Sequence, residues 1–237
     1  MGHRPEGNPP VVVGVDGSSS AADAARWAAR EAARRGAPLE VMTRAHEAIP
    51  LLIAASRRAA LLVVGDRGLG RVAGLTAHAE CPVVVVRGEQ PSGNDGPVVV
   101  GVDGSQLSEA ALAFAFQAAD LREALLIAVH AWSDSALDAG LVPLLSWDDV
   151  ETGEHPLLAE WLAGWSEKYP DVVVQRVVVR DRPDRAVIEQ ATAAAARLVV
   201  VGSHGRGGAT ALGSVSHAVL HHAPCPVAVI RPERTLR

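Results

Sequence analysis

Three short glycine-containing segments in the second half of the chain have the composition of an anion-binding site. They are Gly101–Ser105 (GVDGS), Gly202–Gly205 (GSHG) and Gly213–Ser216 (GSVS). Glycine lets the backbone pass close to a bulky group, and the start of a helix presents free N–H groups to an anion. The hydroxyls of Ser214 and Ser216 can add donors. These segments therefore predict a site that holds phosphate groups without a lysine.

A carboxylate, Asp103, lies in the first of these segments. It cannot sit well against phosphate oxygens because like charges repel. It is better suited to accept hydrogen bonds from ribose hydroxyls, or to hold a Mg²⁺ ion on the phosphates. A simpler interpretation is helix capping, since Asp and Ser ahead of a helix often satisfy its first N–H groups. The segment that contains Asp103 and the glycine-serine segments, brought together at one crevice, favour a nucleotide site.

No pattern typical of a catalytic or metal centre accompanies these segments. His204 lies in the second glycine segment, where it either touches the nucleotide or faces water. His221 and His222 are adjacent, so they face different sides of a helix, and no third ligand follows at a suitable spacing. No Ser-His-Asp arrangement or nucleophile elbow is present. We therefore expect no catalytic residue, no metal ligands and no enzyme activity.

The elements that position these segments follow from the apolar pattern. Continuous apolar runs are typical of strands buried on both faces, and Ala and Leu at helical spacing indicate helices between them. In the second half the expected strands are Val98–Val102, Ala124–Ala131, Val172–Val179, Leu198–Val201 and Pro226–Ile230, and the expected helices are Gln106–Leu121, Pro156–Tyr169, Asp184–Ala196 and Ser214–His222, with a loop over Ser133–Val150. This alternation predicts a parallel sheet whose ligands bind beyond the carboxyl ends of the strands.

The chain contains one long internal repeat. VVVGVDGS at Val11–Ser18 recurs at Val98–Ser105, VVGDRG at Val63–Gly68 corresponds to VVGSHG at Val200–Gly205, and CPVVVVR at Cys81–Arg87 corresponds to CPVAVIR at Cys225–Arg231. A repeat of this length is a duplicated domain, since solenoid periods are shorter. The offset grows from 87 to 137 and then to 144 residues, so the first copy lacks 50 residues in its middle and 7 more before its Cys-Pro.

The repeat predicts two domains of unequal size, residues 9–88 and 97–233, joined by the polar linker Gly88–Gly96. The fold class is α/β, with two Rossmann-like domains, each an open parallel β-sheet with helices on both faces. The first domain is incomplete, because its second helix and third strand are absent. The stretch after Gly70 is RVAGLTAHAECP, which we expect to leave little room for a helix.

Composition excludes several classes of function. A net charge of −5 argues against a nucleic-acid partner held through its phosphates. The N-terminal stretch MGHRPEGNPP lacks the apolar region of a secretion signal, and no apolar run is long enough to span a bilayer. Cys81 and Cys225 each precede a proline at equivalent places in the repeat, and we expect buried thiols rather than a disulfide. These features predict a cytoplasmic protein that binds neither nucleic acid nor membrane.

The motifs quoted above resemble the universal stress protein family, in particular its tandem two-domain type. ATP-binding members of this family carry G-x2-G-x9-G-[S/T] after the fourth strand and an Asp after the first. GSHGRGGATALGSVSHAVLHHAPCPVAVI and VVVGVDGS are similar to these patterns, and the resemblance covers nearly the whole chain. One departure is the spacer between Gly205 and Gly213, which holds seven residues (Arg206–Leu212) instead of nine.

The resemblance implies that the second copy binds ATP, with Mg²⁺ as an optional companion. The base would lie near Gly101 and Ala131, and the ribose and phosphates near Asp103 and the glycine-serine segments. The residues implied in binding are Gly101, Val102, Asp103, Ala131, Gly202, Gly205, Gly213, Ser214, Val215 and Ser216.

The first copy departs much further from the family pattern. Asp16 and the pair Gly65 and Gly68 remain, but no Gly-Ser pair follows them. The phosphate-holding end of the site is missing, so we expect at most one nucleotide per chain. The resemblance implies that the first copy pairs with the second edge to edge through the last strand, as a pseudo-dimer. A homodimer, in which a second chain supplies the missing parts, stays open.

Three functions are compatible with these motifs. The first is an ATP-binding regulatory or stress-response protein with little or no turnover, because no general base, catalytic lysine or arginine finger is evident near the phosphates. The second is a slow ATP hydrolase, in which Asp103 or His204 would position water. The third is an interaction scaffold without ligand. Trp132, Trp147, Trp161 and Trp165 lie in the region that the first copy lacks, where they either pack a core or form a partner surface.

Overall fold

The computed structural model describes residues 8–43, 48–67, 69–87, 96–132, 147–204 and 212–231. In these residues the strands are β1 (Val11–Gly14), β2 (Leu39–Met42), β3 (Leu61–Gly65), β4 (Val83–Val86), β5 (Val98–Gly101), β6 (Leu126–Trp132), β7 (Val174–Arg180), β8 (Leu198–Gly202) and β9 (Val227–Ile230). The helices are α1 (Ser19–Arg35), α2 (Ala48–Ser56), α3 (Leu69–His78), α4 (Gln106–Asp120), α5 (Trp147–Lys168), α6 (Pro183–Ala193) and α7 (Ser214–His222).

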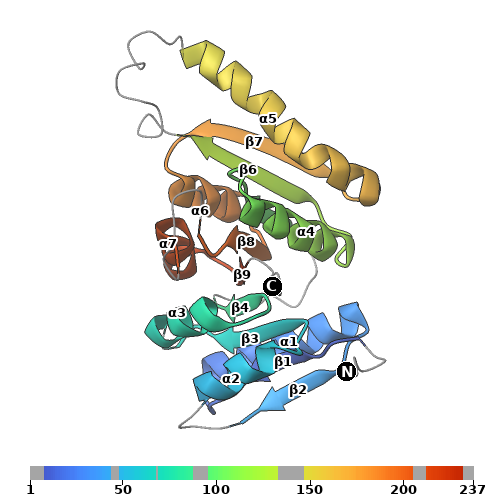
Figure 1. The fold of residues 1–237 in the computed structure, drawn as a ribbon, viewed down its shortest axis with the longest axis vertical. Helices are drawn as coiled ribbons and strands as arrows, with labels where there is room; N and C mark the ends of the chain where they lie inside the picture. Colours follow the sequence, from blue (N-terminus) through green and yellow to red (C-terminus); the bar gives the residue numbers. More distant parts are fainter. Residues whose placement is uncertain are drawn as a thin grey trace, which may run out of the picture.

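All nine strands form one sheet, in the order β2-β1-β3-β4-β9-β8-β5-β6-β7. Neighbouring strands are parallel except β4 and β9, which pair antiparallel. The sheet therefore runs without a break from the N-terminal half, residues 8–87, into the C-terminal half, residues 96–231 (Figure 1). The expected edge-to-edge pairing of the two copies through their last strands is the pairing of β4 with β9.

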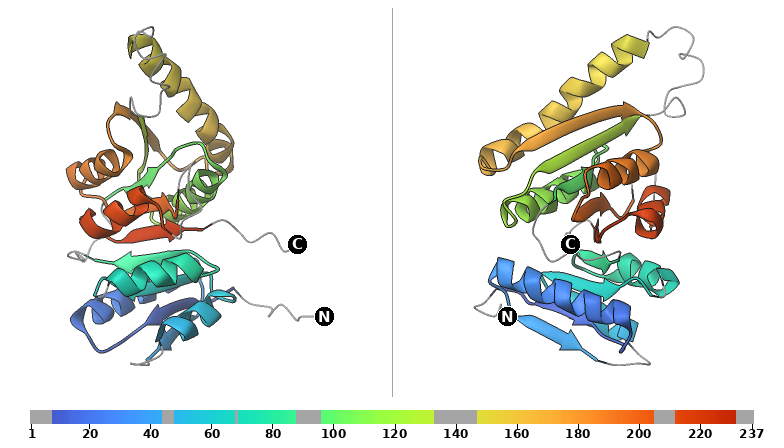
Figure 2. Two further views of the ribbon diagram at one scale, coloured as in Figure 1. Left: turned by 60° about the vertical axis from the view of Figure 1, so that its left-hand side comes forward. Right: turned by 180° about the vertical axis from the view of Figure 1, so that it is seen from behind.

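Helices cover both faces of the sheet, which gives the α/β architecture expected for a Rossmann-like fold (Figure 2). One apolar core joins α1, α4 and α5 to the sheet, and a second core on the opposite face joins it to α2, α3, α6 and α7. The central strands are almost entirely valine, leucine and alanine, because parallel strands covered on both faces have no solvent-facing side.

The two halves share one topology, from which the N-terminal half has lost a part. The C-terminal strands β6-β5-β8-β9 correspond in order to β2-β1-β3-β4. In the described residues, no counterpart of α5 or β7 lies between β2 and α2. The predicted loss of the second helix and third strand is therefore confirmed. As a result, β2 forms one outer edge of the sheet and β7 forms the other.

A pair of equivalent arginines connects the halves on one face. Arg231 follows β9 and donates to the carbonyl of Thr76 on α3 at 2.9 Å, and Arg87 follows β4 and donates to the carbonyl of Leu220 on α7. Both arginines and both acceptors are related by the repeat offset of 144 residues. The junction is therefore a pseudo-two-fold interface.

Two sequence predictions about helices were wrong. The loop expected over Ser133–Val150 ends earlier, because α5 begins at Trp147 and contains Pro156; residues 133–146 lie outside the described chain. The sequence of residues 147–151 is acidic and suits the start of a helix, since carboxylates stabilise its N-terminal dipole. In the N-terminal half α3 forms directly after Gly68, so the seven missing residues remove the loop before the helix and leave the helix itself.

The tryptophans of the C-terminal half contribute to packing. Trp132 is buried in the core on the side of α5, and Trp161 and Trp165 on α5 pack against the same core. These contacts favour the first of the two interpretations, packing rather than a partner surface. The side chain of Trp147 lies outside the described part of the chain.

Two smaller features complete the fold. Cys81 and Cys225 are buried and unpaired with each other, which confirms the expected buried thiols. In the described part of the chain, no helix combines the length and the apolar character that crossing a membrane requires.

Candidate nucleotide-binding site

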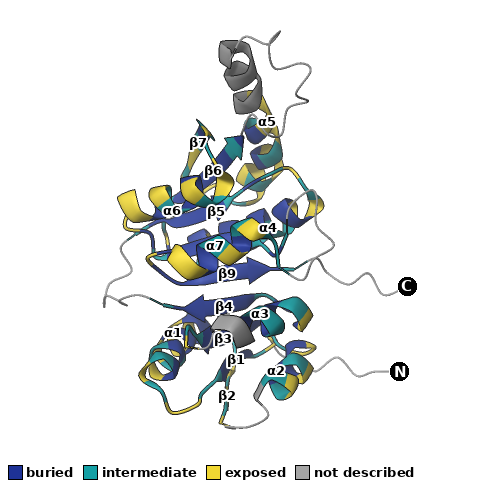
Figure 3. Ribbon diagram, turned by 90° about the vertical axis from the view of Figure 1, so that its left-hand side faces the viewer, coloured by how far each residue is buried: buried dark blue, intermediate teal, exposed yellow. Residues whose placement is uncertain are grey.

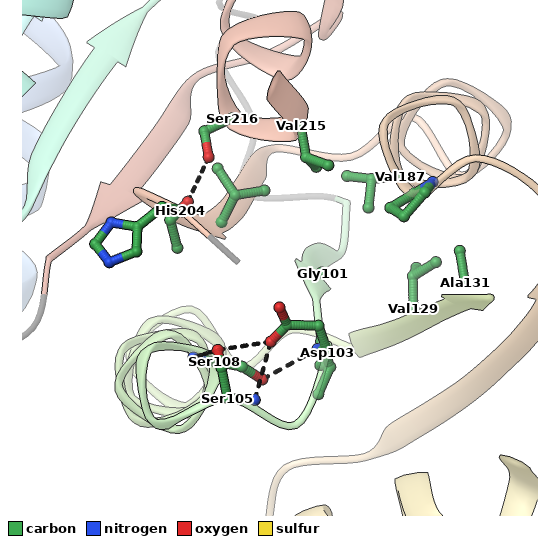
Figure 4. A pocket seen from close by; sticks show the side chains of 14 residues that line it. Gly101, Asp103, Ser105, Ser108, Val129, Ala131, Val187, His204, Val215 and Ser216 are labelled. Carbon is green, nitrogen blue, oxygen red and sulfur yellow. Dashed lines mark hydrogen bonds between the residues drawn. The ribbon is translucent and has the colours of Figure 1, made fainter. Parts of the chain in front are cut away.

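A pocket opens at the carboxyl ends of β5 and β8, where the winding of the C-terminal sheet reverses (Figure 4). This is the position at which open parallel sheets bind their ligands. The residues that line it are Gly101, Val102, Asp103, Ser105, Ser108, Val129, Ala131, Pro183, Val187, Val201, Gly202, His204, Val215 and Ser216. The pocket thus brings together all the residues expected to bind ligand except Gly205, Gly213 and Ser214.

One end of the pocket is an apolar slot. Val129 and Ala131 lie on β6, and Val187 lies on α6 opposite them (Figure 4). Pro183, at the start of α6, also lines the pocket. A side chain at Gly101 would place its Cβ 3.2 Å from Val187 Cγ2, so glycine keeps the floor of the slot open. An apolar slot of this kind suits a flat, weakly polar ring.

Asp103 stands between this slot and the glycine-serine segments. Its Oδ1 accepts hydrogen bonds from the Ser105 backbone N–H at 3.0 Å and from the Ser105 hydroxyl at 2.7 Å. Ser105 itself caps α4, because its Oγ accepts from the Ser108 backbone N–H at 3.2 Å. The capping residue is therefore Ser105, and Asp103 braces it with one oxygen while the other turns toward the open space of the pocket (Figure 4).

The start of α7 closes the other end of the pocket. Gly213 is its N-cap, and no side chain makes a capping hydrogen bond there, whereas Ser18 caps α1 and Ser105 caps α4. The adjoining Val215 and Ser216 line the pocket. The first turn of α7 therefore borders the cavity, and its N-cap residue has no side chain to bind the free N–H groups.

The serines and glycines of this segment have roles that differ from the sequence expectation. Ser216 is buried, and its hydroxyl donates to the Gly202 carbonyl at 2.5 Å, so it ties α7 to β8 instead of offering a free donor. Ser214 is exposed, and neither it nor Gly213 is among the lining residues. The Gly213 N–H donates to the Ser203 carbonyl at 2.6 Å. Gly205 lies outside the described residues.

Only two of the described lining residues ionise, Asp103 and His204. His204 Nδ1 lies 3.1 Å from the Ser203 hydroxyl, and its ring stands at the margin of the pocket (Figure 4). No group of three or more His, Cys, Asp or Glu side chains that could hold a metal ion occurs in the described residues. The described lining therefore offers a ligand backbone groups, apolar side chains, serine hydroxyls, one imidazole and one carboxylate.

The equivalent place in the N-terminal half is built differently. Asp16 braces the cap residue Ser18 as Asp103 braces Ser105, and the hydrogen bonds from Ser18 lower the pKa of the Asp16 carboxyl. However, the hydroxyl of Ser20 donates to Asp66 Oδ1 at 2.7 Å, which joins the start of α1 to the end of β3. Leu107 and Ser203 occupy these positions in the C-terminal half. The N-terminal half thus has a second carboxylate at the end of β3, where the C-terminal half has the buried Ser203.

The apolar slot was not predicted from the sequence. Val129, Pro183 and Val187 belong to no motif, and the latter two reach the pocket only because α6 packs beside β5 and β6. Pro183 at the first turn of α6 marks where that helix begins, and this was the one available signal. Ser105 and Ser108 could have been predicted as pocket residues from the sequence, because they follow Asp103 closely.

Comparison with known proteins identifies relatives of this chain and of its fold. The model of the universal stress protein family matches residues 8–50 and 96–231. Universal stress protein Rv2005c of Mycobacterium tuberculosis is 39% identical, over 93% of this chain and 96% of that protein, and Rv2623 of the same organism is 37% identical, over 95% and 97%. The crystal structure of a universal stress protein from Archaeoglobus fulgidus has the same fold, with a TM-score of 0.67, 16% identity, and coverage of 96% of this chain and 97% of that one.

The alignments also bear on the incomplete first copy. They extend over 288 and 292 positions, more than the 237 residues of this chain, so both relatives contain segments that this chain lacks. The family model leaves residues 51–95 unmatched, which lie in the shortened part of the N-terminal half and the segment that follows it.

Proposed function

The chain belongs to the universal stress protein family, and from this premise we propose that its C-terminal half binds one ATP molecule in the pocket between β5 and β8. The protein then acts as a regulatory, stress-response component whose conformation or partner depends on nucleotide, with little or no turnover. The two ends of the pocket differ in chemistry, and that difference carries the proposal.

The pocket offers three environments in the order that a nucleotide needs. The slot between β6 and α6 is apolar and accepts the base. The free oxygen of Asp103 accepts hydrogen bonds from ribose hydroxyls. The start of α7 faces the remaining space and stabilises phosphate charge. The observation that supports this most strongly is that one pocket joins an apolar slot, the Asp103 carboxylate and the first turn of α7.

Mg²⁺ enters this proposal through the ATP. Magnesium in nucleotide sites is held by one or two carboxylates together with the phosphates and water. Asp103 supplies one carboxylate, and no cluster of ligands sufficient for a metal alone occurs in the described residues. We therefore expect Mg²⁺ to strengthen ATP binding and to show no binding of its own.

Turnover should be slow because the described lining of the pocket contains no lysine or arginine to stabilise a transferring phosphate, and only Asp103 and His204 could position water. Slow hydrolysis with Asp103 or His204 positioning water is the second candidate. Phosphate release from a saturated sample separates the two. A rate above about 1 per second, ordinary for an enzyme, would contradict the regulatory proposal.

Binding is tested with labelled ATP at equilibrium, with and without Mg²⁺. The variant Gly101→Val fills the floor of the slot, and Gly14→Val is its matched control at the equivalent end of β1. We expect the first to weaken binding at least about tenfold, a difference of about 1.4 kcal/mol, and the second to leave it unchanged. If the wild-type chain binds no ATP, the interaction scaffold becomes the better description.

A further inference from the structure

The junction between the halves carries reciprocal contacts between arginine and aromatic residues, on the face covered by α1 and α4. The Arg35 guanidinium lies 5.2 Å from the ring centroid of Phe114, and the Arg122 guanidinium lies 5.9 Å from that of Trp27. The repeat offset of 87 residues relates Arg35 to Arg122 and Trp27 to Phe114. Each half therefore places the same kind of pair against the other.

Glu31 breaks this symmetry. It is fully buried, and its carboxylate accepts from Arg35 Nε at 2.7 Å and from Arg122 Nη2. Arg122 is buried as well and also donates to the Ala118 carbonyl at 2.9 Å. Ala118 is the residue equivalent to Glu31 in the C-terminal half. One carboxylate, contributed by the N-terminal half alone, thus neutralises arginines from both halves.

The strands at the junction do not discriminate between partners. β4 and β9 read VVVV and VAVI, and they pair through backbone groups with Val84 opposite Ala228. Since these two residues are related by the offset of 144, the pseudo-two-fold axis passes between them. A second β9 could therefore replace β4 with the same register, and the choice of partner must come from side chains.

The buried charges supply that choice. If a second C-terminal half replaced the N-terminal half, Arg122 would face another Arg122, with Ala118 on both sides and no carboxylate. A buried charge left without its partner is strongly destabilising. Two N-terminal halves are disfavoured by another contact, because Arg35 donates to Gln117 Oε1 at 3.2 Å, and the residue equivalent to Gln117 is Arg30.

We propose that Glu31 is the specificity residue of this interface. It makes the N-terminal half the partner of the C-terminal surface formed by β9, Phe114 and Arg122, and it excludes a second C-terminal half from that surface. The partner that fits this surface is a copy of the repeat with a carboxylate at the position of Glu31. The internal duplication is thereby directed to pair within one chain.

The test uses the full chain with Ala228→Cys as a reporter. If two C-terminal halves pair, the introduced thiols of the two chains face each other across the axis, and oxidation yields a covalent dimer. We expect Glu31→Ala to raise the dimer fraction at least about tenfold. A tenfold rise corresponds to a loss of about 1.4 kcal/mol in the free-energy preference for the N-terminal half as partner. Asp23→Ala removes a carboxylate paired with Arg26 on the same helix and should change nothing. A chain without Ala228→Cys controls for the two native cysteines. An unchanged dimer fraction in Glu31→Ala would overturn the proposal.

A second variant separates specificity from a merely structural role. Glu31→Ala combined with Ala118→Glu moves the carboxylate across the pseudo-two-fold axis, where it again lies between both arginines. We expect this chain to regain the wild-type denaturation midpoint but to keep the raised dimer fraction, because the C-terminal surface now carries its own carboxylate. If the midpoint returns and the dimer fraction falls to the wild-type level, Glu31 is only structural. If the midpoint does not return, the proposed geometry is wrong.

Discussion

Asp103 serves the helix and the pocket at the same time. One carboxylate oxygen holds the cap residue Ser105 in place, and the other is turned toward the cavity. The two interpretations that the sequence allowed, capping and ligand binding, are therefore compatible. Asp16 holds Ser18 in the same way, although its surroundings differ. A motif repeated within one chain can thus keep its structural role where the surrounding site has changed.

The two cysteines predict a pH dependence of stability. Burial raises the pKa of both the Cys81 and the Cys225 thiols to about 12, from 9.0. Well below pH 9.0 the thiols are protonated in the folded and unfolded states, so they do not change the stability with pH. As the pH rises from about 9 toward 12 the unfolded thiols ionise first, and stability falls.

Urea denaturation between about pH 7.5 and pH 10.5 checks this, with the Cys81→Ala and Cys225→Ala double variant as the control. The wild-type chain should lose more stability than the double variant over this range, because only it contains the buried thiols. Equal loss in the two proteins would show that other groups account for the pH dependence.

At the scale of single residues the sequence revealed motif positions more readily than packing positions. Asp103 and Gly202 line the pocket as the motif suggested, because both lie at the ends of strands that the valine runs mark. Val187 could not be found, because it looks like any other core residue until α6 is placed beside β5. The role of Ser216 was also out of reach, since a serine at a helix start can donate to a ligand or to a neighbouring strand.

At the scale of elements, the lost helix and strand leave β2 uncovered. Leu39 and Val41 are 38% and 54% exposed, whereas their equivalents Leu126 and Ala128 on β6 are both 0% exposed. All four side chains point toward the face of the sheet on which α5 covers the C-terminal half. Figure 3 shows how burial varies along the chain. The deletion therefore changes the environment of an element without changing its sequence pattern.

This contrast predicts unequal effects of the same substitution. Leu126→Ala should destabilise the protein by about 2–5 kcal/mol, because it leaves a cavity in a close-packed core. Leu39→Ala should cost no more than about 0.5–1 kcal/mol, because the side chain is already partly in water. Urea denaturation of the two variants measures both values. Similar losses would mean that β2 is covered in solution, for instance by another chain.

Element boundaries were less predictable than element types. The strands and most helices follow from buried valine runs and alanine-rich segments. α5 begins earlier than expected because Pro156 resembles a helix start, and this signal outweighed the acidic residues 147–151 that suit the true start. The connection between β3 and β4 is too short to hold both a loop and a helix, and the repeat offset does not show which of the two is lost. The sequence therefore did not predict α3.

At the scale of the molecule, the two halves form one sheet and share two cores. Both cores include residues from each half, and the Arg122–Glu31 pair and the Arg87 and Arg231 contacts lie on opposite faces of the junction. The duplication and the missing segment were evident from the sequence alone. The asymmetric charge at the junction was not, because Glu31 and Arg122 stand 91 residues apart.

A continuous sheet predicts that the halves unfold together. Thermal denaturation of the wild-type chain should give one transition, with tryptophan fluorescence and circular dichroism coinciding. Arg122→Ala leaves Glu31 buried with less compensation, and it should separate the transition of the N-terminal half, which contains Trp27, from that of the C-terminal half. A single unchanged transition in Arg122→Ala would show that the strand pairing of β4 and β9 alone couples the halves.

The most direct test of the whole account is the stoichiometry of ATP binding, measured by isothermal titration in the presence of Mg²⁺. The account predicts one ATP per wild-type chain. It predicts a loss of at least about tenfold in affinity for Asp103→Ala, because both the ribose hydrogen bonds and the bracing of Ser105 are removed. Asp16→Ala, which loses the same bracing at the equivalent position, should still bind one ATP with wild-type affinity. Two ATP molecules per chain, or equal effects of the two substitutions, would contradict it.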